Sequence, residues 1–331
     1  MLKWIEQTLQ SPKVAAVPIM THPGIEIIGK TVKDAVSNGQ VHYQAVKALV
    51  DKYPSAASTL IMDLTVEAEA FGAPIRMTDN EIPTICGRLL CDADAIDALK
   101  VPSLSAGRVP QYLMADMLSA RTISSRPVFA GCIGPFSLAG RLYDMNEIMM
   151  GIYIEPDAMH RLLEKCTAFL LNYCQAIKKT GVAGVVMAEP AAGLLSNEDA
   201  LTFSTQYIQR IVQAVQDDNF TLILHNCGNT GHCTDAMVQS GARALHFGNM
   251  IDMEQVMHEV PSNIMVMGNL DPVSIFKQAS PEKVYAATME LLEKMKPYSN
   301  FVISSGCDLP PEVPFANIDA FFKAVDDFSK L

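Results

Sequence analysis

The chain has 331 residues, of which 49% are hydrophobic and 18% are charged, and its formal net charge is −11 at pH 7. This acidic balance argues against nucleic acid or an anionic membrane as the main partner. The composition is typical of a soluble globular protein with an ample core, and eight cysteines in a chain of this length do not make a disulfide scaffold.

The first segment, residues 1–6, reads MLKWIE, a pattern typical of an amphipathic helix and not of a signal peptide. No apolar run in the sequence reaches the length of a membrane-spanning helix. We therefore expect a cytoplasmic protein whose cysteines are reduced.

Eight short apolar runs follow along the chain, and amphipathic stretches separate the later ones. Short buried strands that alternate with helices indicate a parallel sheet, and eight of them favour closure into a (β/α)8 barrel. An open doubly wound sheet is the alternative. The expected strands span residues 15–20, 59–63, 127–132, 184–189, 221–227, 244–249, 264–270 and 301–307, and the clearest helices span 157–179, 196–216, 281–296 and 316–328.

The second and third expected strands are separated by residues 67–126, which exceed one crossover helix and contain four prolines. We predict an insertion with extra helices in this stretch. The sequence shows no low-complexity linker, repeat or break in composition. The simplest organisation is one α/β domain over residues 1–331: a (β/α)8 TIM barrel with an N-terminal helical extension and a helical insertion after strand 2.

Polar side chains stand where the expected strands end. Chemistry in such barrels gathers at the carboxyl ends of the strands, so these side chains are expected to share one rim. They include His22, Asp63, Glu189, His225, Cys227, His246, Asn249, Asn269, Asp271, Cys307 and Asp308.

Three of these residues form a candidate metal site. Side chains alternate along a strand, so His225 and Cys227 point to the same side, and Cys307 ends another strand about eighty residues later. One imidazole and two thiols are a soft ligand set that zinc holds well. Three protein ligands leave one position open, which favours a catalytic zinc. The alternative is a buried polar histidine with two inert core thiols.

The open position of such a site suits a thiol substrate. A thiol bound there would lose its proton at neutral pH and become a nucleophile for alkyl transfer. Activation of water for hydrolysis is the other use of an open zinc, and Glu189 would then be the general base.

The sequence resembles the uroporphyrinogen decarboxylase superfamily over nearly its whole length, and within it the methylcobamide:coenzyme M methyltransferase branch. The triplet of His225, Cys227 and Cys307 marks the zinc methyltransferase branch. A more remote resemblance, to cobalamin-independent methionine synthases, rests on the same triplet. The motifs that carry the resemblance are MDLTVEAEAFG at 62–72, GPFSLA at 134–139, AEP at 188–190, HNCG at 225–228, MGNLDP at 267–272 and SGCDLP at 305–310.

The resemblance implies a (β/α)8 barrel that moves a methyl group from a methylated corrinoid protein to a thiol bound on zinc. His225, Cys227 and Cys307 would hold the Zn²⁺. We expect Glu189 and Asp63 to be catalytic residues that orient the reactants. Asn269 and His22 are expected to contact the cofactor, and hydrogen bonding at the barrel rim is the alternative for Glu189, Asp63 and Asn269.

Three features separate this chain from other members. Its first arginine is Arg76, so the first strand lacks a cation for the propionates of a porphyrinogen, which disfavours that decarboxylation. Residues 246–249 read HFGN and offer no carboxylate, so the fourth zinc ligand is open between water, the substrate thiol, Glu189 and His246. No Asp-x-His-x-x-Gly stretch is present, so we expect a partner protein to carry the corrinoid.

Rival functions remain open from the sequence. They are a metal-free decarboxylase of the same superfamily, a zinc hydrolase that uses Glu189 as base, and a corrinoid-sensing protein that lacks turnover. The acceptor is also open between coenzyme M, homocysteine, another small thiol and a non-thiol such as a folate.

Overall fold

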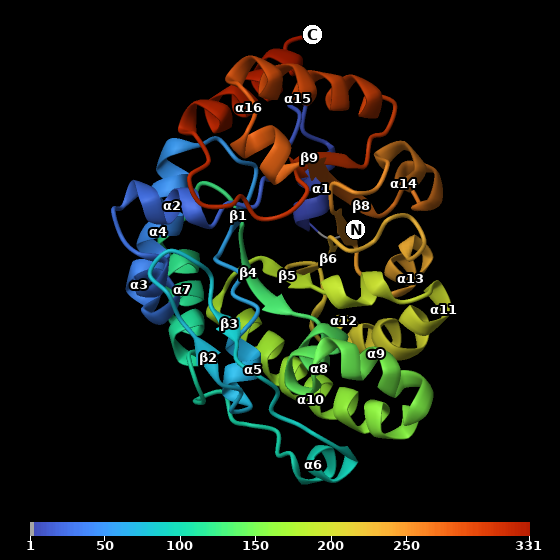
Figure 1. Cartoon of the computed structure of the whole chain (residues 1–331). Coiled ribbons are helices and arrows are strands. Elements are labelled where there is room, and N and C mark those ends of the chain that lie inside the picture. Colours follow the sequence, from blue (N-terminus) through green and yellow to red (C-terminus); the bar gives the residue numbers. More distant parts are fainter. Residues whose placement is uncertain (1–2) are drawn as a thin grey trace.

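The computed structural model describes residues 3–331, and the first two residues of the predicted N-terminal helix, Met1 and Leu2, lie outside the described residues. A curled parallel sheet of seven strands, in the order β1-β4-β5-β6-β7-β8-β9, lies at the centre with helices around it (Figure 1). This order has no reversal of the kind that defines a doubly wound sheet, so that alternative is wrong. The strands are β1 Ser58–Thr59, β4 Val128–Ile133, β5 Gly184–Ala188, β6 Thr221–Asn226, β7 Ala244–Phe247, β8 Met265–Leu270 and β9 Phe301–Ser305.

The first expected strand, residues 15–20, is reduced to one isolated parallel bridge between Ala16 and Ile303 of β9. The Val17 amide donates to the Ile303 carbonyl at 2.9 Å, and the amide of Ala56, just before β1, donates to the Ala16 carbonyl at 2.9 Å. This segment therefore bonds to both ends of the seven-stranded sheet, although the predicted regular strand is not formed.

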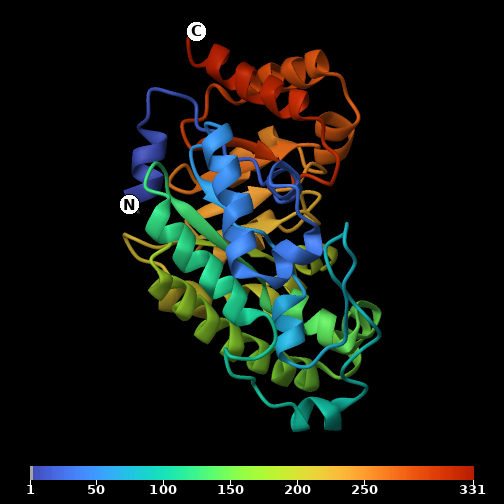
Figure 2. The ribbon, with the colours of Figure 1, turned by 90° about the vertical axis from the view of Figure 1, so that its left-hand side faces the viewer.

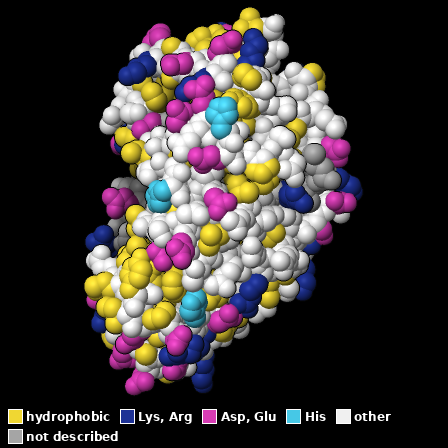
Figure 3. Space-filling model, turned by 90° about the vertical axis from the view of Figure 1, so that its right-hand side faces the viewer, with side chains coloured by type: hydrophobic (Ala, Val, Ile, Leu, Met, Phe, Trp, Pro, Cys, Tyr) yellow, Lys and Arg dark blue, Asp and Glu magenta, His cyan; other side chains and the backbone are white. Residues whose placement is uncertain are grey.

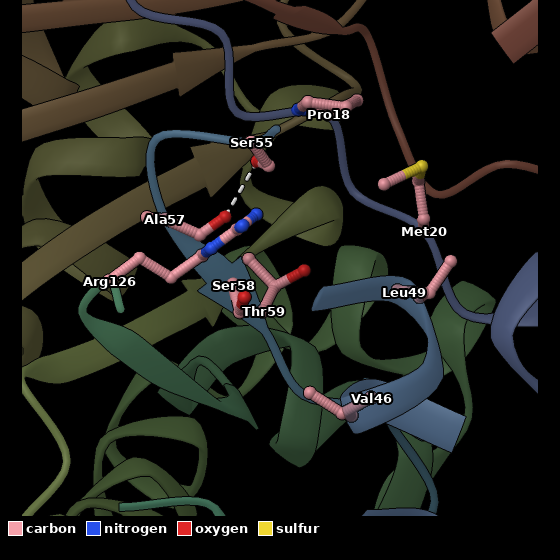
Figure 4. A pocket seen from close by; sticks show the side chains of 9 residues that line it. All are labelled: Pro18, Met20, Val46, Leu49, Ser55, Ala57, Ser58, Thr59 and Arg126. Atoms are coloured by element: carbon pink, nitrogen blue, oxygen red, sulfur yellow. Dashed lines mark hydrogen bonds between the residues drawn. The ribbon is translucent and has the colours of Figure 1, made fainter. Parts of the chain in front are cut away.

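Pro18 explains why the pairing stops. It has no backbone N–H and cannot extend a ladder. Figure 4 shows this part of the chain beside β1 and α4 (Gly39–Lys52). A cavity of about 10 Å³ lies here, lined by Pro18, Met20, Val46 and Leu49 among others. That volume is room for about one water molecule, so this hollow is not a substrate site.

The four clearest predicted helices are confirmed. They appear as α10 Pro156–Thr180, as α11 Asn197–Ala200 continuing through η2 Leu201–Thr205 into α12 Gln206–Val215, as α15 Pro281–Met295 and as α16 Phe315–Phe328. The longest, α10, ends at Gly181, which adopts a φ of 96° that a glycine accepts without strain.

The stretch after β1 contains helices, as predicted, and also a small antiparallel sheet that the sequence did not indicate. The helices are α5 Val66–Ala70, α6 Ala93–Ala98 and α7 Val109–Thr122, and the two strands are β2 Ile75–Arg76 and β3 Thr84–Ile85. Pro74 and Pro83 directly precede these strands, where a helix cannot continue. Figure 2 shows α7 beside α4, which belongs to the N-terminal segment.

The remaining helices begin with α1 Lys3–Leu9, which agrees with the amphipathic start of the chain. Across residues 3–331, no helix combines the length and apolar character needed to span a bilayer. The others are α2 His22–Ile27, α3 Val32–Ser37, α8 Pro135–Tyr143, α9 Met145–Ile154, η1 Pro190–Leu194, α13 Thr234–Gln239, α14 Met253–Glu259 and η3 Pro272–Lys277.

One buried cluster joins the strands across the inner face of the curled sheet and includes Phe129, Ile223, Met267 and Val302. Ile223 and His225 are two residues apart on β6, so their side chains share a face. His225 therefore points to the same side as this apolar cluster, one step closer to the carboxyl ends of the strands.

Candidate metal centre

The side chains of His225, Cys227 and Cys307 converge at the carboxyl ends of β6 and β9. One potential ligand atom from each lies within 4.8 Å of the other two. The local sequence explains the placement, because β6 is buried throughout and delivers His225 to its inner face, and Cys227 follows two residues later. Glu189 and His246 are not part of this three-residue group.

The separation of Cys307 and His225 fits a tetrahedral ion. Bond lengths of about 2.3 Å to sulfur and about 2.0 Å to nitrogen place neighbouring ligand atoms roughly 3.5–3.8 Å apart. The Cys307 Sγ lies 3.8 Å from His225 Nε2. The donor set and this separation therefore suit zinc.

A chain of hydrogen bonds sets the tautomer of His225. The Ser304 hydroxyl donates to the Val17 carbonyl at 2.7 Å, and a carbonyl can only accept. Ser304 Oγ therefore accepts from Nε2–H of His246 at 2.8 Å, which leaves a lone pair on His246 Nδ1. That nitrogen lies 2.8 Å from His225 Nδ1, so His225 carries its proton on Nδ1 and its free lone pair on Nε2. The lone pair faces Cys307.

This network also limits which side chains could be the fourth zinc ligand. Both ring nitrogens of His246 are occupied, one by His225 and one by Ser304. Burial lowers the pKa of His246 well below its usual value, which agrees with a neutral ring in this chain of bonds. His246 thus orients the candidate ligand His225 and has no free nitrogen with which to bind an ion itself.

The two thiols are not equivalent. A hydrogen bond from Cys307 lowers the pKa of Cys227 to about 7, despite an opposing effect of burial. The same bond, together with burial, raises the pKa of Cys307. Cys227 is therefore the first of the pair to become a thiolate, the form that binds metal.

The loop after β6 is held by its own polar groups. Asn226 Oδ1 accepts from the amides of Gly228 at 2.9 Å and Asn229 at 3.0 Å. Gly248 packs against this loop so closely that a Cβ there would lie 2.7 Å from the Cys227 Cα. A side chain at position 248 would displace Cys227.

Glu189 is buried and turns away from the metal candidates. Ala188 pairs with His225 in the sheet, so Glu189, the next residue, points to the other face. Its Oε1 accepts from the Ser137 amide in the first turn of α8 at 2.7 Å. Its Oε2 lies against Gly134 and has no hydrogen-bond partner among residues 3–331. Burial raises the pKa of Glu189 to about 8.

Asp63 is fully engaged in a buried network. It forms an ion pair with Arg108 and accepts from the amide and the hydroxyl of Thr65 at 3.0 and 2.7 Å. Arg108 also pairs with Glu69 at 2.6 Å. The role of Arg108 is not predictable from its local sequence pattern, because nothing in that pattern indicates that it pairs with a residue 45 positions earlier.

Asn269 and His22 lie in different surroundings. The Asn269 amide donates to the carbonyls of Gly248 and Ile251 at 2.9 and 2.8 Å, which ties β8 to the loop after β7. His22 is the first residue of α2 and lines a separate cleft of about 450 Å³. Burial, and secondarily Lys277, lowers the pKa of His22 to about 4.

Asp308 connects the His22 region to the metal candidates. It follows Cys307, and its Oδ1 accepts from the Thr21 amide at 2.7 Å. Burial raises the pKa of Asp308 to about 7. The Asp308 side chain thus ties the residue that follows Cys307 to the residue that precedes His22.

Comparison with known proteins agrees with this architecture. A methyltransferase from Methanosarcina mazei superposes with a TM-score of 0.88 at 22% identity, over 99% of each chain. A B12-independent methionine synthase from Shewanella sp. W3-18-1 superposes with a TM-score of 0.60 at 11% identity, over 96% of each chain. At these identities the likeness concerns the fold.

Similarity in sequence points to the same group. The chain is 27% identical to the methylcobamide:CoM methyltransferase MtbA of Methanosarcina mazei over 270 residues, which are 80% of this chain and 78% of the relative. It is 27% identical to the uroporphyrinogen decarboxylase of Cellvibrio japonicus over 291 residues, 85% of this chain and 80% of the relative. The family model for uroporphyrinogen decarboxylase (URO-D) matches residues 7–328. The resemblance read from the motifs is thereby confirmed: the chain belongs to the uroporphyrinogen decarboxylase family.

Proposed function

We propose that this protein is a zinc-dependent methyltransferase that moves a methyl group from a methylated corrinoid protein to a thiol. The observation that carries the proposal is the convergence of His225, Cys227 and Cys307, with the lone pair of His225 Nε2 directed at Cys307. Three ligands leave a tetrahedral ion one position for a substrate. The similarity to MtbA supports an enzyme of the corrinoid-dependent methyltransferase class.

When bound, zinc would supply the Lewis acidity that keeps an acceptor sulfur deprotonated at neutral pH. The residues of the chain hold and orient its site. Cys227 reaches the thiolate state first, and His246 and Ser304 keep the proton of His225 on Nδ1. A methylated corrinoid carried by a partner would supply the methyl carbon to the acceptor sulfur, and it would keep the electron pair of its broken cobalt–carbon bond.

These contacts reduce the number of candidates for the fourth zinc ligand. His246 has both nitrogens occupied, and Glu189 points to the other face of β5. Of the alternatives drawn from the sequence, water and the acceptor thiol are left. Direct catalytic roles for Glu189 and Asp63 and cofactor contacts for Asn269 and His22 stay predictions. Their hydrogen bonds favour supporting roles.

We infer that residues 15–17 complete an eight-stranded barrel. They bond to β9 on one side and to Ala56, two residues before β1, on the other, which is the position of the missing strand. Closure of this kind leaves the carboxyl ends of the strands facing one mouth. A location in the cytoplasm stays a prediction from the sequence.

The surface offers a place for a corrinoid-carrying partner. Met150, Tyr153 and Ile154 on α9 and Leu194 on η1 are exposed apolar side chains. The short helix η1 directly follows the carboxyl end of β5, and α9 follows α8, which begins at the carboxyl end of β4. Figure 3 shows hydrophobic side chains gathered at the lower left of one face, among scattered charges. An exposed apolar patch of this kind favours a transient protein contact.

Zinc analysis combined with a methylcobalamin demethylation assay tests the proposal. We expect about one zinc per chain and demethylation that depends on an added thiol from a panel with coenzyme M and homocysteine. The competing activity is metal-free decarboxylation, since decarboxylation is the reaction for which the uroporphyrinogen decarboxylase relatives are named. A chain purified without metal that decarboxylates a porphyrinogen and ignores thiols would overturn the proposal.

A further inference from the structure

The two cysteines of the candidate metal centre come from strands that are not neighbours. Cys227 follows β6 and Cys307 follows β9, with β7 and β8 between them in the sheet. Adjacent strands are about 4.8 Å apart, so three steps across a flat sheet span roughly 14 Å. The two sulfur atoms nevertheless lie within 4.8 Å of each other. Curling of the sheet brings the strand ends together, but both cysteines lie on loops, with Gly306 directly before Cys307, so contacts between the loops set their final separation.

The turn that follows β7, residues 248–251 and hereafter the β7 turn, packs against both loops that carry the cysteines. A Cβ on Gly248 would lie 2.7 Å from the Cys227 Cα, and a Cβ on Gly306 would lie 2.6 Å from the Asn249 amide nitrogen. Both distances are shorter than real Cβ contacts, so the backbones touch directly at both places. A shift of the β7 turn would therefore displace the two cysteine loops.

Asn269, near the end of β8, holds the β7 turn through its side chain. Its Nδ2 donates to the carbonyls of Gly248 at 2.9 Å and Ile251 at 2.8 Å, which are the first and last residues of the turn. The next residue of β8, Leu270, accepts from the Gly306 amide at 2.7 Å through its carbonyl. The end of β8 thus holds one cysteine loop directly and reaches the other through the β7 turn.

The other contacts of the β7 turn restrain its backbone less. Asn249 Nδ2 donates to Asp271 Oδ2 at 2.9 Å, which is a bond between two side chains. Met250 at the tip is 67% exposed, and Ile251 is the one buried apolar side chain of the turn. A segment with so little packing depends on its hydrogen bonds for a fixed position. The two bonds from Asn269 to the backbone are therefore the main restraint on the turn.

We propose that Asn269 is a positioning residue of the metal site: its two hydrogen bonds fix the β7 turn, and the turn fixes the separation of Cys227 and Cys307. This proposal rests on the proposed function and deepens it. A tetrahedral ion with two bonds of about 2.3 Å to sulfur needs sulfur atoms roughly 3.8 Å apart. A turn that moves relaxes this separation and weakens the site. Asn269 thus acts on Cys227 through the backbone of Gly248.

Titration of the metal-free full chain with Co²⁺ tests this role, because Co²⁺ held tetrahedrally by thiolates has strong and characteristic visible absorption. Asn269→Asp replaces both donors with acceptors and should lower the Co²⁺ affinity roughly tenfold and weaken the tetrahedral bands at saturation. The added negative charge would by itself favour a cation, so a fall in affinity reports the lost hydrogen bonds.

Asn317→Asp is the matched control. Asn317 Nδ2 also donates to two carbonyls, those of Phe276 at 2.7 Å and Ala279 at 2.9 Å, and ties α16 to the segment of η3. This variant should lose stability in urea unfolding but keep the Co²⁺ affinity and spectrum of the unchanged chain. Equal losses of affinity in Asn269→Asp and Asn317→Asp would assign the effect to general destabilisation and overturn the proposal.

Gly248→Ala tests the contact between the β7 turn and Cys227, because its Cβ would push the two apart. The Co²⁺ affinity should fall roughly tenfold or more, with a fold that circular dichroism shows to be intact. Unchanged Co²⁺ affinity and spectrum in either Gly248→Ala or Asn269→Asp would overturn the proposal. Co²⁺ binding that depends on Asn269, in a protein whose zinc-loaded form methylates no thiol, would sink the proposed function and leave the positioning role standing. A chain that binds neither Co²⁺ nor Zn²⁺ would sink both.

Discussion

Two groups of buried polar residues lie at the carboxyl ends of the strands, and they use their hydrogen bonds differently. On the β6, β7 and β9 side, His246 and Ser304 satisfy each other and leave the ligand atom of His225 free. On the β1 and β5 side, Asp63 and Glu189 face Arg108 and the first turn of α8. The first set, the metal group, directs lone pairs toward a candidate ion site, whereas the second set, the acidic group of Asp63 and Glu189, joins the helices to the sheet.

The largest difference between the two groups should appear on removal of a single ligand. Cys307→Ser is expected to lower zinc affinity by more than the roughly 10–100-fold that loss of an outer partner produces, and to abolish thiol methylation. Glu189→Gln should keep the zinc content of the unchanged chain. Metal analysis of both variants after dialysis, with circular dichroism to check the fold, makes the comparison.

Cys233→Ser is the matched control for the thiol. Cys233 is buried close to the metal loop, and its Sγ donates to the Leu195 carbonyl at 3.1 Å, a bond that a hydroxyl preserves. This variant should bind zinc normally. Full methylation by metal-depleted Cys307→Ser would refute the role given to the site.

The convergence of His225, Cys227 and Cys307 could be predicted from the sequence better than the direction of Glu189, and alternation along strands explains why. His225 and Cys227 are two apart on one strand, so their common direction is readable from the sequence. Glu189 also ends a strand, but its direction depends on the register between β5 and β6, which no local pattern reveals.

Hydrogen-bond and ion-pair partners that lie far apart in the sequence could not be predicted, for the same reason. Ser304 is joined to His246 only because β7, β8 and β9 align in a particular register, and Arg108 reaches Asp63 across 45 positions. Most strands and the long helices could be predicted from the periodicity of apolar residues. Pro18 weakened the first strand, and the two-residue strands β2 and β3 are too short to leave a periodic signal.

The acidic group should dominate stability. Asp63→Asn removes one of the two carboxylates that pair with the buried Arg108 guanidinium and leaves only Glu69, so it should lower the free energy of unfolding by about 2 kcal/mol, because a buried charge that loses a charged partner is costly. Zinc content should not change. Asp51→Asn is the control, since Asp51 pairs with Lys47 on the surface and should shift stability by less than about 0.5 kcal/mol. Urea unfolding of the two variants gives the difference, and equal losses would contradict the assignment.

Ser304→Ala sharpens the comparison within the metal group. The variant removes the acceptor that holds the proton of His246 on Nε2, so the tautomer of His225 is no longer set. Zinc affinity should fall roughly 10–100-fold, as for other partners of a ligand histidine. Ser305→Ala is the matched control: Ser305 is equally buried, and its hydroxyl accepts from the Ile19 amide outside this chain of bonds. Equal zinc affinity in the two variants would show that the hydrogen-bond chain has no part in binding.

The last difference is expected in the pH response of Glu67, a buried residue of α5 whose carboxyl accepts from the Ile133 amide at 3.0 Å. Burial raises the pKa of Glu67 from 4.5 to about 7, so between these values the folded chain holds a proton that the unfolded chain has released. The free energy of unfolding should therefore fall as pH rises across this window, by about 1.4 kcal/mol per pH unit from this group. Glu67→Gln removes that contribution, whereas Glu198→Gln on the exposed surface of α11 should retain it. Denaturant unfolding at several pH values measures both slopes. Glu189 and Asp308 also have raised pKa values and contribute to the slope of unfolding free energy against pH in every variant. The test is therefore the difference in slope between Glu67→Gln and Glu198→Gln. Identical slopes would mean that the pKa of Glu67 is not raised in the folded chain.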